Sequence, residues 1–201
     1  MTQTTREKMI AGALDLLSRH GVYATSLREV VQHTGTPRGS IAHHFPGGKR
    51  QLLQEALQLA SDQVAAPLAA LTAERGAVAG LRAFVDWWRR VLVASDFRAG
   101  CPVLAVAVEP LAGDAAEAVA DNEALRAQVH AAFARWQAIL TEALRAEGLA
   151  PARAARLAAL VLAAVEGTVA MCRAARSAQP LDEVHQELEA ALAAAIAAAR
   201  G

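Results

Sequence analysis

The 201-residue sequence has little of what marks secreted, metal-binding or membrane-spanning proteins. It has two cysteines, Cys101 and Cys172, which are too few for a disulfide framework and match no zinc-site spacing. The N-terminus lacks the apolar stretch of a secretory signal. The most apolar run, Leu157–Cys172, contains Glu166 and is short for a membrane span, so it is predicted to be a buried helix. We therefore expect a cytoplasmic protein without a metal, cofactor or membrane partner.

Aromatic residues are also scarce, at 4%, and the formal net charge is +0. A zero net charge by itself says nothing about nucleic acid, but the charges are unevenly distributed. Residues 1–60 hold seven Lys/Arg and four Asp/Glu, a net of +3, whereas residues 61–201 hold thirteen and sixteen, a net of −3. We call residues 1–60 the head and residues 61–201 the body. A mildly basic head and a mildly acidic body are typical of a protein in which one part binds DNA and the other has a different function.

What the sequence has in abundance is alanine and leucine in helical patterns. Hydrophobic residues make up 54% of the chain, enough for a sizeable core in one or two modest domains. We predict an all-α fold of about nine helices, because the one alternating stretch is brief and alanine favours a helix. Pro67 is expected to kink or end the fourth helix, and Gly113 to mark a further break. The predicted helices are Thr4 to Gly21, Ser26 to Gly35, Thr36 to Phe45, Gly48 to Pro67, Leu81 to Leu92, Pro102 to Val108, Ala124 to Glu147, Pro151 to Ser177 and Pro180 to Arg200.

Residues 26–45 carry the most informative local pattern. Ser26 and Glu29 have the spacing of a capping box, which starts a helix, and Gly35 ends that helix because glycine readily adopts the left-handed conformation. Thr36 can cap the next helix, and Pro37 suits its first position. This second helix is short and begins with polar or tiny residues. The pattern is that of a helix-turn-helix whose second helix offers its N-terminal end to a DNA major groove.

The chemistry of these first-turn residues assigns roles on DNA. Arg38 can pair with guanine in bidentate fashion, and Gly39 lets the backbone approach the duplex closely. The hydroxyls of Thr36 and Ser40 can bond a phosphate or a base edge. The alternative is a plain helical hairpin in a core, but the short helix has too few apolar residues to be purely structural.

Two further cations are predicted to contact the DNA backbone. Arg28 can reach it from the preceding helix. Lys49 stands at the N-terminus of the following helix, where the helix dipole and a cation both favour phosphate.

These residues resemble the N-terminal domain of TetR-type transcriptional regulators. The resemblance covers the first sixty residues, and it implies a phosphate contact for His43. For His44 a DNA contact and a packing or capping role both stay open. The chain departs from the family pattern at Ala42, where many relatives carry a tyrosine that commonly contacts a phosphate. The resemblance is carried by Gly21-Val22-Tyr23-Ala24-Thr25-Ser26, Gly35-Thr36-Pro37-Arg38-Gly39-Ser40-Ile41, His43-His44-Phe45, Lys49 and Leu52-Leu53. The predicted DNA-binding residues are therefore Ser26, Arg28, Thr36, Pro37, Arg38, Gly39, Ser40, His43, His44 and Lys49.

The resemblance also implies the organisation of the remaining chain. We expect a DNA-binding domain at residues 1–48, a connecting helix at 48–66, and an effector-binding and dimerisation domain at 49–201. Aromatic clustering is the body's own indication of an effector pocket, although ordinary core packing is the alternative for each aromatic residue. An apolar or planar ligand with a few polar anchors would suit the predicted ligand-binding residues, which are Phe84, Trp87, Trp88, Cys101, Glu109, His130, Phe133, Trp136, Glu166 and Met171.

Two of these residues have specific alternatives. Glu166 either anchors a ligand or is a charge that faces solvent or pairs with Arg173. Gly100-Cys101-Pro102-Val103 resembles a motif in a TetR subgroup whose members include regulators of drug efflux. Cys101 either lines the pocket, senses oxidation, or is a small buried residue beside a helix start.

The last two helices are predicted to form a homodimer interface. One stripe holds the small residues Ala163, Gly167, Ala170 and Ala174, and another holds Leu181, Val184, Leu188, Leu192 and Ala195. Two such helices from each subunit would form a four-helix bundle about a two-fold axis, and intramolecular packing is the alternative. A dimer would also place two heads on an inverted-repeat operator.

The predicted function is a ligand-responsive DNA-binding regulator, most simply a repressor that a small apolar or aromatic effector releases. Two other classes of protein are alternatives. An all-α enzyme would use Cys101 with His130 or Glu109, although no signature links these residues. A helical protein-interaction module would have neither DNA nor ligand function.

Overall fold

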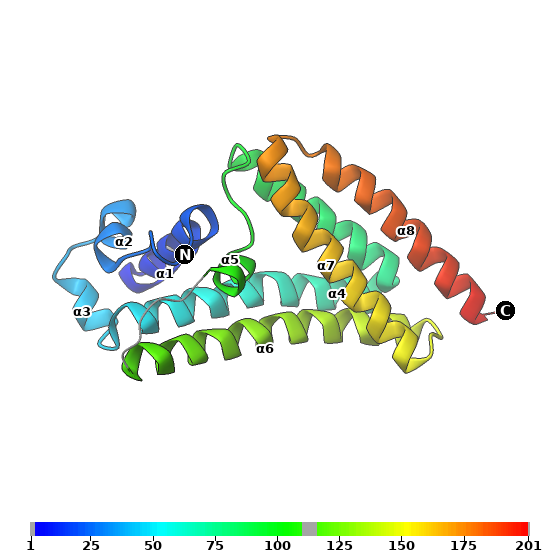
Figure 1. The fold of residues 1–201 in the computed structure, drawn as a ribbon, viewed down its shortest axis with the longest axis horizontal. Coiled ribbons are helices and arrows are strands. Elements are labelled where there is room, and N and C mark those ends of the chain that lie inside the picture. The colour runs from blue at the N-terminus through cyan, green and yellow to red at the C-terminus, as the bar shows by residue number, and fades with distance from the viewer. Residues whose placement is uncertain (1–2, 110–115, 201) are drawn as a thin grey trace. The chain divides into compact units, whose positions relative to one another are not determined.

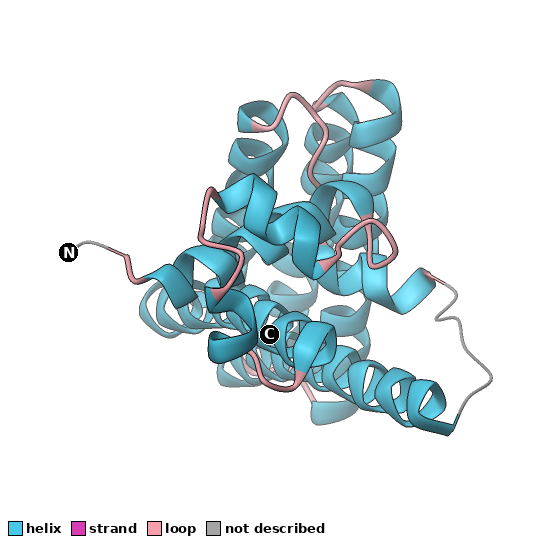
Figure 2. Ribbon diagram, turned by 90° about the vertical axis from the view of Figure 1, so that its left-hand side faces the viewer, coloured by secondary structure: helices cyan, strands magenta, loops and turns pink. Residues whose placement is uncertain are grey.

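The computed structural model describes residues 3–109 and 116–200, and every regular element in this part of the chain is an α-helix (Figure 1). Loops and turns join the successive helices from α1 to α5 and from α6 to α8 (Figure 2). The all-α prediction is confirmed, and the predicted break at Gly113 lies outside the described residues. The helices are α1 (Thr5–His20), α2 (Leu27–Thr34), α3 (Ser40–His44), α4 (Gly48–Ala94), α5 (Pro102–Val108), α6 (Ala116–Ala146), α7 (Pro151–Ala175) and α8 (Gln179–Arg200).

Residue contacts divide the chain into two compact units. Unit 1 takes in the residues up to Asp62 together with Cys101–Ala132, and unit 2 takes in Gln63–Gly100 and the residues from Phe133 onward. Each unit is therefore discontinuous in sequence. Unit 1 adds α5 and part of α6 to the predicted head, which a division of the chain near residue 48 does not anticipate.

Capping boxes start the first two helices, as the sequence predicts. Thr4 Oγ1 accepts from the Glu7 amide at 3.2 Å, and the Thr4 amide donates to Glu7 Oε2 at 2.8 Å. Ser26 and Glu29 repeat the arrangement at 3.2 and 2.9 Å. Each pair satisfies two amide donors that have no partner within the helix. The positions of α1 and α2 are therefore set by local sequence.

The capping boxes predict a pH-dependent contribution to stability. Hydrogen bonds from the Ser26 side chain and backbone lower the pKa of Glu29 below its ordinary value of 4.5. The folded state then binds fewer protons than the unfolded state, so the carboxylate stabilises the fold above about pH 4.5, and this contribution is lost as the pH falls through the lowered pKa. We expect Glu29→Gln to lower the urea midpoint at pH 7 and to leave it nearly unchanged at pH 3. Glu123→Gln, at an exposed α6 position, is the control; an equal loss at both pH values would contradict the prediction.

The helix-turn-helix differs from prediction at one boundary. α2 ends at Gly35 as expected, with φ of 63° and its amide donating to the Val31 carbonyl. The next helix, however, begins at Ser40 rather than after a Thr36 cap, and its N-cap is Gly39. The Ser40 amide and hydroxyl both bond the Pro37 carbonyl, at 3.1 and 2.7 Å. The predicted start is wrong because a turn over residues 37–40 takes up the hydrogen bonds that a first helical turn would use.

α4 is longer than predicted because Pro67 does not end it. The helix continues past Pro67 and is interrupted at Gly76, where φ is 81° and ψ is 176°. Beyond this break the Ala77 amide donates to Glu147 Oε1 at 2.6 Å, and a Cβ on Gly76 would lie 2.8 Å from the same oxygen. Glycine is therefore required there both by its backbone conformation and by space. Counting the two parts of α4 separately gives nine helical segments in the described chain, which matches the predicted number.

The core of unit 2 is built around buried aromatic residues. Trp88 and Trp136 are each 1% exposed, and Trp88 contacts the rings of Phe84 and Trp87 edge-on, with centroids at 6.5 and 4.7 Å. Trp88 and Trp136 are therefore core residues, which is the alternative to a ligand-binding role for each of them. Ion pairs from Arg82 to Glu189 and from Arg89 to Asp182 join the second part of α4 to α8.

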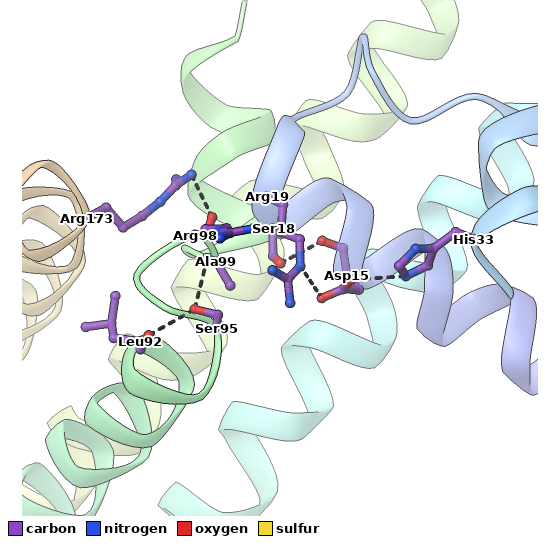
Figure 3. A network of polar contacts seen from close by, with 9 residues as sticks. All are labelled: Asp15, Ser18, Arg19, His33, Leu92, Ser95, Arg98, Ala99 and Arg173. Carbon is purple, nitrogen blue, oxygen red and sulfur yellow. Dashed lines mark hydrogen bonds and ion pairs between the residues drawn. The ribbon is translucent and has the colours of Figure 1, made fainter. Parts of the chain in front are cut away.

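The loop after α4 is held by its own polar contacts (Figure 3). The Ser95 hydroxyl donates to the Leu92 carbonyl at 3.1 Å and accepts from the Ala99 amide at 3.1 Å. From α7, Arg173 Nη2 donates to the Arg98 carbonyl at 3.0 Å. These contacts hold the loop that connects α4 to α5.

Candidate functional site

The predicted DNA-reading residues lie on the solvent-facing side of the α2–α3 turn. Arg38, Gly39 and His43 are exposed, and Arg28 is exposed on α2. The Arg38 guanidinium forms no ion pair within the described part of the chain, so its donors are available to a ligand. Beneath them, Phe45 is 1% exposed and anchors the end of α3 in the core of unit 1. The short helix is thus held from one side and open on the other.

The hydroxyls predicted to contact DNA have partners within the head. Thr36 is 9% exposed, and its Oγ1 lies 2.8 Å from Thr34 Oγ1. Ser40 Oγ donates to the Pro37 carbonyl, and Ser26 Oγ serves in the capping box of α2. Pro37 itself is exposed. A structural role therefore exists for each of these hydroxyls, and their DNA contacts stay a prediction.

The two histidines of α3 occupy different surroundings. His43 is exposed, whereas His44 is half-buried between the rings of His43 and Phe45, with centroids at 5.3 and 6.5 Å. From α1, the guanidinium of Arg6 lies 5.2 Å from the centre of the Phe45 ring. The packing alternative for His44 fits this geometry, while His43 remains open to a phosphate.

Asp15 joins α1 to α2 through His33, a contact that sequence reasoning missed. Asp15 accepts from Arg19 Nε at 2.8 Å and lies 3.1 Å from His33 Nε2 (Figure 3). The four-residue spacing of Asp15 and Arg19 is visible in the sequence. The His33 contact is not, because it depends on how the two helices pack.

Lys49 and Glu109 lie together at the α1–α2 turn, which the sequence does not predict. Lys49 Nζ donates to the Val22 carbonyl at 2.7 Å and is half-buried. Glu109 accepts from the amides of Val22 and Tyr23 at 2.6 and 2.9 Å. Lys49 was expected to face a DNA phosphate and Glu109 a body ligand; the structure instead engages both side chains with the backbone of unit 1.

Unit 2 contains a cavity of about 210 Å³ between the two parts of α4. Phe84 and Trp87 line it, together with apolar residues of the first part and the polar residues Gln63, Asp86 and Arg90. Phe84 and Trp87 are thus the members of the predicted ligand set that share this cavity. An apolar lining with a few polar groups is typical of small-molecule sites.

The other predicted ligand residues lie elsewhere. Trp88 and Trp136 are core residues, and Phe133 stacks edge-on against Trp136 at 5.5 Å. Met171 is 57% exposed on α7, and His130 is exposed on α6. Glu166 is 4% exposed, so the solvent-facing alternative for it is wrong. Cys101 is buried in unit 1, where its sulfur accepts from the Leu104 amide at the start of α5, at 3.4 Å.

α7 presents an unusual outer face. Ala163, Gly167, Ala170 and Ala174 are all exposed and lie along one stripe, with Leu160 and Met171 beside them at 52% and 57% exposure. A Cβ on Gly167 would meet no atom within 4 Å. By length and mean hydropathy of 1.7 this helix could also cross a membrane, but half of the apolar window is buried, as in the core helix of a soluble protein.

Two family models match this chain. Residues 9–56 match the model of bacterial regulatory proteins of the tetR family, and residues 77–187 match that of the LmrA/YxaF-like transcriptional regulator C-terminal domain. This chain belongs to the TetR family of transcriptional regulators. TetR-family proteins are DNA-binding regulators and not enzymes, which removes the enzyme alternative built on Cys101.

Relatives of this TetR-family regulator match nearly its whole length. An uncharacterised helix-turn-helix regulator of Mycobacterium tuberculosis is 40% identical over 189 residues, covering 92% of this chain and 93% of the relative. The regulator LmrA of Bacillus subtilis is 30% identical over 178 residues, covering 88% and 90%. A TetR regulator from Legionella pneumophila has the same fold, with a TM-score of 0.79 at 20% identity over 94% and 98% of the two chains. The Gly-Cys-Pro subgroup stays a prediction.

Proposed function

We propose that this TetR-family regulator is a cytoplasmic homodimer that represses transcription from an inverted-repeat operator until a small apolar or aromatic effector binds unit 2. The observation that carries the proposal is the cavity beside Phe84 and Trp87, on a chain whose head reads DNA. The exposed stripe of α7 supports the dimer.

In the head, Arg38 reads a base and Gly39 gives the backbone room to approach. The exposed position of both residues at the turn before α3 supports this assignment. His43 and Arg28 bond phosphates on either side. Thr36, Pro37 and Ser40 shape the turn that presents Arg38, and Ser26 fixes the start of α2.

In the body, α7 and α8 of two subunits form a four-helix bundle about a two-fold axis. The outer face of α7 supports this assignment, whereas the leucines of the predicted α8 stripe pack within their own chain: Leu181, Leu188 and Leu192 are 0%, 7% and 1% exposed. Small side chains at Ala163, Gly167 and Ala170 allow the two α7 backbones to approach closely. An exposed apolar stripe of this kind favours a protein partner. A second copy of the chain is such a partner, because the same stripe of each subunit can pack against the other about a two-fold axis. The dimer then holds two heads at a spacing of about one helical turn of DNA.

The effector releases DNA by binding the DNA-incompetent arrangement more tightly than the competent one. α4 supports this coupling because it is continuous from Gly48 to Arg75, and its residues Val64, Pro67 and Leu68 line the cavity. A ligand that displaces this part of the helix also displaces the end next to α3. The coupling is reciprocal, so operator DNA lowers effector affinity by the same factor.

The first experiment recovers operator DNA. Purified protein is mixed with fragmented DNA from the source organism at moderate salt, and the bound fragments are sequenced. Enrichment of one inverted repeat supports the dimeric operator binder. Enrichment of a single half-site would contradict the dimer. In a separate titration, a compound that binds the protein tightly without changing its DNA affinity would contradict the ligand response.

A substitution in the cavity should separate effector binding from DNA binding. We expect Trp87→Ala to weaken binding of a planar apolar probe, 1-aminoanthracene, by about tenfold, or about 1.4 kcal/mol, because an aromatic wall is removed. DNA affinity without the probe should stay unchanged. Probe fluorescence measures the first and DNA anisotropy the second. Val93→Ala, an exposed residue of the same helix outside the lining, is the control; equal probe affinity in both variants would place the ligand elsewhere.

A further inference from the structure

The turn between α1 and α2 is held by two side chains from distant parts of unit 1. Glu109, which follows α5, places one carboxylate oxygen on each of two successive amides: Oε2 on Val22 at 2.6 Å and Oε1 on Tyr23 at 2.9 Å. Lys49, in the first turn of α4, donates to the Val22 carbonyl at 2.7 Å. The N–H of Val22 therefore donates to a carboxylate, and its C=O accepts from an ammonium group.

Gly21 leaves the space that this arrangement needs. Its φ is +78°, and a Cβ at this position would lie 2.6 Å from Glu109 Oε2. The turn is also closed from within, because Thr25 Oγ1 donates to the Gly21 carbonyl at 2.7 Å. The backbone is thus shaped to admit a carboxylate, and only glycine accommodates both the conformation and the contact.

The hydrogen bonds of Glu109 to the two amides stabilise the α1–α2 turn. Hydrogen bonds from amides to an ionised carboxylate are about twice as strong as neutral ones, and two of them fix direction as well as distance. Val22 is 7% exposed, so losing the acceptor would leave its amide without solvent. Burial is the main effect that lowers the pKa of Lys49, and the charges of Glu109 and Glu29 oppose it. The ammonium is directed at the Val22 carbonyl.

We propose that Glu109 and Lys49 are positioning residues for DNA binding, acting together on the peptide groups of Val22. The turn that they hold leads directly into Ser26, the N-cap of α2, and α2 supports the reading turn at Arg38. Small displacements of such a support are enough to misplace the groups that contact a ligand. We name the three residues Glu109, Val22 and Lys49 the turn clamp.

The turn clamp makes a different prediction for Lys49 than a phosphate contact does. A lysine that neutralises a phosphate releases a counterion, so its loss lowers the slope of log affinity against log salt by about 0.9. A lysine that positions the head leaves the slope unchanged and lowers affinity at every salt concentration. The two roles are therefore separable by one titration series.

The experiment measures binding of a fluorescent duplex that the wild-type protein retains, from about 50 to about 300 mM salt, a range over which the Debye length shortens and exposed charges are progressively screened. We expect Glu109→Gln and Lys49→Gln each to weaken binding by about tenfold without changing the salt slope, and the double variant to be no weaker than either alone, because both act on one peptide. Glu123→Gln and Lys8→Gln remove the same charges from exposed positions of unit 1 and are the matched controls.

Amide hydrogen exchange provides the second readout. In both variants the amides of Val22 and Tyr23 should exchange at least tenfold faster, while those of Leu17 and Val30 in the core of unit 1 keep their wild-type protection. Loss of protection throughout unit 1 would assign these residues to stability alone and overturn the proposal. A slope lowered by about 0.9 in Lys49→Gln would restore the phosphate contact, and wild-type affinity in Glu109→Gln would exclude a positioning role.

Discussion

Glu in place of Gly167 should convert the protein to a monomer and weaken operator binding by about 10²–10⁴-fold, because the advantage of two linked heads is lost. Gly167 lies in the middle of the exposed small-residue stripe of α7. In the proposed α7–α8 bundle, this stripe lies close to the two-fold axis, so the new side chain of one subunit would meet that of the other and two carboxylates would be forced together. Light scattering after size exclusion gives the mass, and anisotropy with an inverted-repeat duplex gives the affinity.

The variant should fold normally, which keeps the test interpretable. A Cβ at position 167 meets no atom of its own chain within 4 Å, and glutamate is a better helix former than glycine. Ala138→Glu, at an exposed position of α6, is the matched control and should remain dimeric. A Gly167→Glu dimer with wild-type affinity would show that the subunits associate through another surface.

Arg38→Ala should relax sequence preference at one guanine of each half-site and cost about 1–3 kcal/mol, or about 5–150-fold in affinity. The reason is that the exposed guanidinium is free of ion pairs in the described chain and can form two parallel hydrogen bonds to guanine. Binding to a panel of duplexes with each base at each position measures the effect. The wild-type protein should discriminate at that position and the variant should not.

Arg28→Ala is the comparison that distinguishes recognition of a base from neutralisation of a phosphate. As a phosphate contact, Arg28 should contribute equally to every sequence, so its loss should weaken all duplexes alike and lower the salt slope by about 1. Equal discrimination in the Arg38→Ala and wild-type proteins would move base readout to another side chain of the turn.

Local sequence predicted those features that neighbouring residues determine. The capping boxes at Thr4 and Ser26 and the end of α2 at Gly35 are found where the sequence places them. Each depends on hydrogen bonds between residues a few positions apart, so no knowledge of packing is needed. The same reasoning identified the helix-turn-helix and, through it, the resemblance that family comparison confirms.

Where several interactions compete, local rules were less informative. Pro37 suits a first helical position, yet its carbonyl is taken by both donors of Ser40 and the helix starts later. Pro67 was expected to kink or end α4, but the helix continues to Gly76, where the contact of Ala77 with Glu147 stabilises the break. A proline removes one donor at the cost of a few kcal/mol, which packing of a long apolar face can offset.

The sequence by itself determined the all-α class, the helix-turn-helix and the kind of residues proposed to face DNA, because these follow from periodicity, capping and side-chain chemistry. Only the tertiary structure decided which groups Glu109 and Lys49 contact. They stand 60 positions apart, and nothing in their own neighbourhoods points to Val22. It also separated Trp87, beside a cavity, from Trp88, in the core, although the two are adjacent in sequence. Contacts of this kind arise only when helices pack, since the side chains that meet are brought together by the fold and not by their spacing along the chain.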